Sequence, residues 1–131
     1  MKVLYTIIAL CCLCAVAVAD VSEMRNANQA TVQWDAVVDA TAYRVYSRSV
    51  AGGEQTLLAQ VSETSYTISF DADTSVIMGV QSVRVVTVAG VEQPVEATSD
   101  IAWSDVAANC LEGKTFGLYY VRPPDMPGGL R

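Results

Sequence analysis

The residue types that carry most enzyme chemistry are scarce in this chain. Its 131 residues include no histidine, which removes the imidazole base of nucleophilic triads and the commonest zinc and copper ligand. Asp71 and Asp73 form the closest carboxylate pair in a turn-like segment, where their oxygens would suit calcium. Aspartates in turns more often accept hydrogen bonds from the local backbone. We therefore expect no enzymatic activity, no metal site and no cofactor.

Thiol chemistry depends on which cysteines stay in the mature protein. Cys11, Cys12 and Cys14 lie near the N-terminus, and Cys110 is the only other cysteine. If the N-terminal segment is removed, no internal disulfide can form. Cys110 then either packs against the domain or pairs between two chains, and both interpretations stay open.

Aromatic and proline residues are the remaining candidates for a binding site. Tyrosine and tryptophan offer large contact areas at low entropic cost and stack on sugars or on protein partners. The candidate partner-binding residues are Tyr46, Trp103, Tyr119, Tyr120, Pro124 and Pro127. The alternative is that these rings cover the core of their own small domain, which needs every ring available.

The N-terminus has the layout of a secretory signal. Lys2 precedes an apolar stretch over residues 3–18, and small residues at positions 17–19 stand before Asp20. This pattern predicts a signal peptide over residues 1–19, cleavage after residue 19, and a protein that is secreted or otherwise extracytoplasmic, in the periplasm, at a cell surface or on a particle. The alternative is a retained membrane anchor, for which the stretch is at the short limit.

Charge narrows the class of partner. The chain has 14 acidic and 8 basic residues, a formal charge of −6, and removal of the leader takes Lys2 away as well. Because binding to DNA, RNA or anionic lipid depends on clustered lysine and arginine, we expect no nucleic-acid partner and no membrane contact except through an uncleaved leader.

The mature chain is patterned for strands. Runs of alternating apolar and polar residues, separated by turn signals, predict strands over residues 21–25, 30–35, 42–49, 55–61, 65–70, 76–88 and 94–103. Trp34 and Tyr43 fall on inward positions of two of them. No segment has convincing helical spacing, so we expect an all-β, two-sheet antiparallel sandwich of the immunoglobulin-like kind with about seven strands.

These strands resemble the fibronectin type III family. The resemblance spans about residues 21–104 and rests on Trp34 and on residues 42–46, 64–68, 79–83 and 97–99. It implies a non-catalytic interaction domain, and small exported or phage-associated proteins with one such domain are the nearest in character. The sequence departs from the family by placing Val76 where a tyrosine is usual, which removes one hydrogen bond near the loop before it.

The C-terminal extension is the least ordinary segment. We expect the sandwich over residues 20–108 and an extension over residues 109–131, with an extra strand at 115–121 followed by a proline-rich end. That end would be disordered, fold onto its own sandwich as an edge strand, or add to a partner as an arm.

Together these observations predict an exported interaction or adhesion-type module that binds a protein or glycan partner. The alternative is a structural subunit or decoration protein of a virion or surface assembly, joined through the C-terminal arm. Self-association by strand addition or through Cys110 is the further partner expectation.

Overall fold

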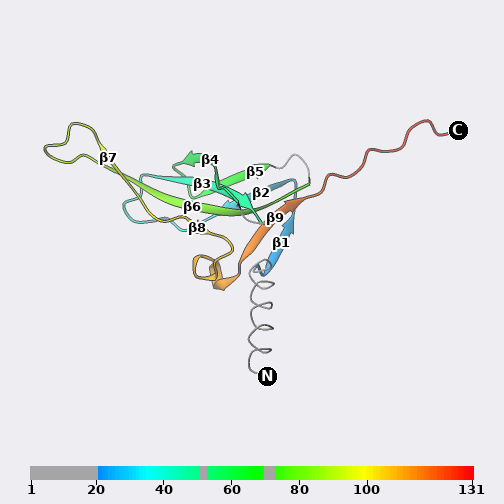
Figure 1. Ribbon diagram of the computed structural model, residues 1–131, viewed down its shortest axis with the longest axis horizontal. Helices are drawn as coiled ribbons and strands as arrows, with labels where there is room; N and C mark the ends of the chain where they lie inside the picture. The colour runs from blue at the N-terminus through cyan, green and yellow to red at the C-terminus, as the bar shows by residue number, and fades with distance from the viewer. Residues whose placement is uncertain (1–20, 51–52, 70–72) are drawn as a thin grey trace, which may run out of the picture.

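The computed structural model describes residues 21–50, 53–69 and 73–131. The expected signal peptide and Asp71 lie outside the described residues. Within them the chain forms strands and two 3₁₀ turns, η1 (Ala107–Asn109) and η2 (Leu111–Gly113), and no α-helix. Figure 1 shows the strands gathered in one body, with a long hairpin on one side and the C-terminal end on the other.

In the part of the chain that the structure describes, nine strands form two sheets, which confirms the expected all-β sandwich. The smaller sheet contains β2 (Gln29–Gln33) and β5 (Ser65–Ser69). The larger sheet contains β1 (Glu23–Asn26), β3 (Ala42–Ser49), β4 (Thr56–Val61), β6 (Thr74–Val86), β7 (Val95–Thr98), β8 (Ala102–Trp103) and β9 (Phe116–Tyr120). Its order is β1-β9-β6-β3-β4, and β7 and β8 also pair with β6.

The core lies where the two sheets face each other. Val32 and Ile68 of the smaller sheet pack against Val45, Met78 and Leu118 of the larger one, and all five are buried. The Trp34 and Tyr43 rings meet edge to face, with centroids 5.5 Å apart, in the geometry that aromatic pairs prefer. The alternation read from the sequence therefore assigned the inward faces of β2, β3 and β5 correctly.

The last expected strand is broken into pieces. Residues 94–103 were expected as one strand, but the register against β6 shifts between β7 and β8, and the chain then leaves the sheet until β9. Ser104, just after β8, links β6 to β9 where the strand is interrupted. Its Oγ donates to the Phe116 carbonyl at 2.7 Å and accepts from the Met78 N–H at 3.1 Å. A buried serine thus supplies hydrogen bonds that a continuous strand would have made.

The first strand joins the larger sheet rather than the smaller one. β1 runs parallel to β9, with Glu23 opposite Phe116 and Asn26 opposite Tyr119, and the Ser22 N–H donates to Thr115 Oγ1 at 2.8 Å. β9 consequently lies between β1 and β6, in the interior of the sheet. β2 is left with β5 as its one paired neighbour within the described part of the chain.

Two glycines on the larger sheet give room to bulky neighbours. A Cβ at Gly79 would lie 2.6 Å from Trp103 Cε3 and from Ile101 Cγ2, and one at Gly117 would lie 2.6 Å from Met24 Sδ. Contacts this short are incompatible with any larger residue unless the neighbour moves. Because Gly79 and Gly117 have no side chain, Trp103 and Met24 can pack directly against the backbone of β6 and β9.

No helix in the described residues is long and apolar enough to cross a membrane.

Candidate functional site

Two of the predicted binding residues lie in one row of the larger sheet. Tyr46 of β3 is opposite Gly79 of β6, and Gly79 is opposite Trp103 of β8. Both rings are half-buried, and the Tyr46 hydroxyl donates to Gln81 Oε1 at 3.0 Å. The row therefore brings Tyr46 and Trp103 together without presenting a fully exposed aromatic platform.

Trp103 is covered by an ion pair. The Arg48 guanidinium lies 4.7 Å from the Trp103 ring centroid, and its Nη2 is 2.5 Å from Asp105 Oδ2. Both charged side chains are 23% exposed, and Asp105 Oδ1 is buried without a hydrogen-bond partner among the described residues. A cation over an indole face contributes about 0.5–2 kcal/mol, depending on how far it is desolvated. Much of the ring surface is thus already used within the chain.

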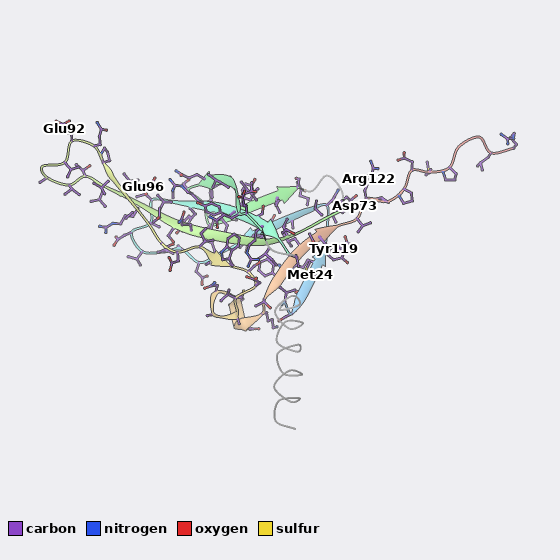
Figure 2. The ribbon with its side chains drawn as sticks, viewed as in Figure 1. Met24, Asp73, Glu92, Glu96, Tyr119 and Arg122 are labelled. Atoms are coloured by element: carbon purple, nitrogen blue, oxygen red, sulfur yellow. The ribbon has the colours of Figure 1, made fainter. Side chains whose placement is uncertain are left out.

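Tyr119 and Tyr120 belong to β9, away from that row. Tyr119 is opposite Asn26 and Ser75, and Tyr120 is opposite Thr74. Successive strand residues point to opposite faces, so the two tyrosines cannot share one surface. Both are half-buried, and Tyr119 is labelled in Figure 2. The structure does not join these rings to Tyr46 and Trp103 in one site.

Pro124 and Pro127 lie in an extended C-terminal arm, defined here as residues 122–131. The arm has no secondary structure, every residue in it is exposed, and Figure 1 shows it leading away from the body. The arm is joined to the body where it begins: the Arg122 N–H donates to Asp73 Oδ1, just before β6, at 3.1 Å (Figure 2). Asp73 therefore uses its carboxylate on a backbone donor, and the described residues contain no cluster of three or more metal-ligating side chains.

Cys110 lies between η1 and η2 and is half-buried. Its Sγ is 3.3 Å from the Ser104 carbonyl and 3.4 Å from the Val106 carbonyl. Burial, with a smaller effect of the nearby Asp105 charge, raises the pKa of the thiol. The thiol is thereby held in its protonated, less nucleophilic form. Pairing between chains through Cys110 stays a prediction.

A groove that the sequence did not reveal opens beside β2. It has a volume of about 450 Å³ and lies between the free edge of β2, the inner face of the larger sheet, and the residues that leave the sheet after β8. Its lining includes Thr31, Trp34, Ala102, Trp103, Cys110 and Phe116. The Arg25 guanidinium lies 4.3 Å from the Phe116 ring centroid at one side. Residues from six segments meet here, so no local pattern marks the groove.

The second feature is the projecting hairpin, residues 83–98, made by the end of β6, β7 and the loop between them (Figure 1). The sequence predicted its two strands and a turn at Gly90, but it did not predict that the hairpin extends beyond the packed body. Its valines at 85, 88, 91 and 95 are 40–47% exposed, and every residue of β7 is exposed. At its root Arg44 Nη2 lies 2.6 Å from Glu96 Oε1, and this hydrogen bond raises the pKa of Arg44. The available signal was the unusual length of the β-rich segment 76–88.

Comparison of the chain with protein families, with curated proteins and with solved structures yields no match.

Proposed function

We propose that this chain is an exported, non-catalytic interaction module that binds a protein partner through the projecting hairpin. The observation that carries the proposal is the set of half-exposed valines, distributed over both faces of a hairpin that stands clear of the packed body. Apolar side chains exposed together on a soluble protein mark interaction surfaces. The absence of histidine from the sequence supports a role in binding rather than in acid–base catalysis.

The hairpin favours a protein partner over a glycan. Glycan recognition by stacking needs open ring faces, whereas Trp103 is covered by Arg48 and Tyr46 is half-buried. The outer edge of β7 has no paired strand within the described residues, and it offers backbone groups to an added strand. Glu92 lies on the hairpin (Figure 2) and favours a partner with a basic side chain beside an apolar patch, whereas Glu96 is already paired with Arg44.

The test is equilibrium binding of the purified chain to cell envelopes, glycans and immobilised copies of itself. We expect retention on a protein-containing surface, lost in the double variant Val88→Ser, Val91→Ser and kept in Leu57→Ser, a matched control on β4 that is 53% exposed. Retention on purified glycans that the hairpin variant leaves unchanged would overturn the proposal, as would no retention on any surface.

The second candidate function is that of a subunit in a larger assembly, joined through the C-terminal arm. The free extension of this arm away from the sheet favours it. Truncation after Val121 tests it: loss of self-association with an unchanged melting temperature would support the subunit role, and unchanged self-association would remove the arm from consideration. The hairpin valines stay in the truncated chain, so the two functions are separable.

A further inference from the structure

The edge of β2 that faces away from β5 is the starting point. In a two-layer sandwich the strand preceding β2 would ordinarily lie beside it, but β1 pairs with β9 in the other sheet. Among the described residues the smaller sheet therefore has two strands, and it covers part of the inner face of a seven-stranded sheet. The groove of about 450 Å³ lies at this uncovered place. Its volume is within the range of pockets that hold small ligands and short peptide segments.

The lining of the groove has the chemistry that proline-rich segments use. Trp34 and Phe116 contribute aromatic side chains to its lining, whereas the ring of Trp103, which also lines the groove, is covered by Arg48. Aromatic-lined grooves bind extended proline-rich chains, whose preformed conformation costs little entropy on docking. Trp34 Nε1 is buried and has no hydrogen-bond partner among the described residues. A buried indole N–H without an acceptor is destabilising, and a carbonyl of a docked segment would supply the acceptor.

The C-terminal arm has the complementary chemistry. It carries three prolines, Pro123, Pro124 and Pro127, and its apolar residues Met126 and Leu130 are 91% and 89% exposed. Two arginines against one aspartate also make the arm basic, whereas the whole chain has a formal charge of −6. The charged residues that line the groove are Arg25, Lys114 and Glu112, so the fit of the arm to the groove rests on its prolines and apolar side chains rather than on charge.

Geometry directs the arm to a second molecule. The groove is lined by Phe116, where β9 begins, and the arm follows Tyr120, where β9 ends. The arm then runs outward from the body (Figure 1). Each copy has one arm and one groove at opposite ends of β9, so pairing the arm of one copy with the groove of the next is heterologous and generates rings or open chains.

We propose that the groove beside β2 receives the C-terminal arm of a second copy of this chain. The inference rests on the arm-joined subunit function proposed above, and it adds the receiving site: prolines of the arm pack on Trp34 and Phe116, and an arm carbonyl accepts from Trp34 Nε1.

Tryptophan fluorescence reads the groove directly, because both tryptophans of the chain line it. The chain truncated after Val121 is titrated with a synthetic peptide of residues 122–131, after its melting temperature has been compared with that of the full chain. We expect a saturable change in tryptophan emission. A peptide with alanine in place of the three prolines should bind about tenfold more weakly or worse.

Self-association of the full chain is measured in parallel by sedimentation. Ala102→Arg places a long charged side chain in the groove, and Ala108→Arg is the matched control at an exposed position of η1 outside the lining. We expect Ala102→Arg to abolish both peptide binding and concentration-dependent association, and Ala108→Arg to leave both unchanged.

Three results would overturn the inference. An unchanged emission spectrum on peptide addition removes the groove as the receiving site. Association that is lost on truncation but kept in Ala102→Arg leaves the subunit function standing and places its receptor elsewhere. A monomeric full chain whose truncated form binds the peptide shows that each arm occupies the groove of its own molecule.

Discussion

The two ends of β6 have similar compositions, but the first is buried among neighbouring strands and the second is exposed to solvent. Near its start β6 lies between β3 and the pair β8 and β9, and Ile77 and Met78 are 2% and 1% exposed. Beyond Val83 its one partner in the described residues is β7, and Val85 is 47% exposed. β-Branched residues at the first end build the core, and at the second they maintain an extended hairpin with an apolar surface. Stability and binding should therefore respond to different mutations.

The free energy of unfolding should differ most between two variants that truncate an apolar side chain, one in the core and one in the hairpin. Leu118→Ala empties a position that is 1% exposed and in the core cluster, and it should lower the free energy of unfolding by about 2–5 kcal/mol. Val85→Ala in the hairpin should lower it by less than about 1 kcal/mol. Urea denaturation measures both. Equal losses would show that the hairpin is part of the cooperative core.

Adding a side chain where there is no room for it should have the second largest effect on the free energy of unfolding. Gly79→Ala places a Cβ against Trp103 and Ile101, and we expect a loss of about 1–3 kcal/mol in the free energy of unfolding. Gly128→Ala in the arm meets open space and should change it by less than about 0.5 kcal/mol. If Gly79→Ala is as neutral as the control, the Trp103 ring is not held against the sheet.

The loss of stability on removing a hydrogen-bonding hydroxyl should likewise be larger at a buried position than at an exposed one. Ser104→Ala leaves the Met78 N–H and the Phe116 carbonyl without their buried partner, which should be destabilising by about 1–3 kcal/mol. Ser99→Ala, at an exposed position beside the hairpin, should have a smaller effect because water replaces its bond to the Ser82 N–H. Thermal melting of the two variants side by side makes the comparison, and a larger effect at Ser99 would contradict it.

The smallest effect concerns Cys110 and pH. Its pKa is raised in the folded chain, so the protonated thiol stabilises the fold below the ordinary thiol pKa, and this contribution is lost as pH rises through the folded-state value. Alkylation at mildly alkaline pH should consequently be slower in the folded chain than in urea. Peptide mass mapping separates Cys110 from Cys11, Cys12 and Cys14. Equal rates in both states would show that the thiol is open to solvent.

Strand positions and inward faces followed from local sequence. The alternation around Val32, Tyr43 and Ile68 predicted three strands and the side chains that they bury. A strand with one face in solvent and one in the core must alternate polar and apolar residues. The exposed hairpin surface and the groove could not be predicted from local sequence. Nothing local distinguishes Val85 from Val83, which is 1% exposed, since their burial depends on whether another layer lies over them.

The sequence by itself determined an all-β chain, the faces of its central strands, the lack of imidazole chemistry and the acidic charge, because each depends on residue type and spacing alone. Only the tertiary structure decided that β1 pairs with β9, that β9 lies inside the sheet, and that a groove is left beside β2. These are choices among partners distant in the chain, and they are settled by the summed hydrogen bonds and packing of the whole domain rather than by any one segment.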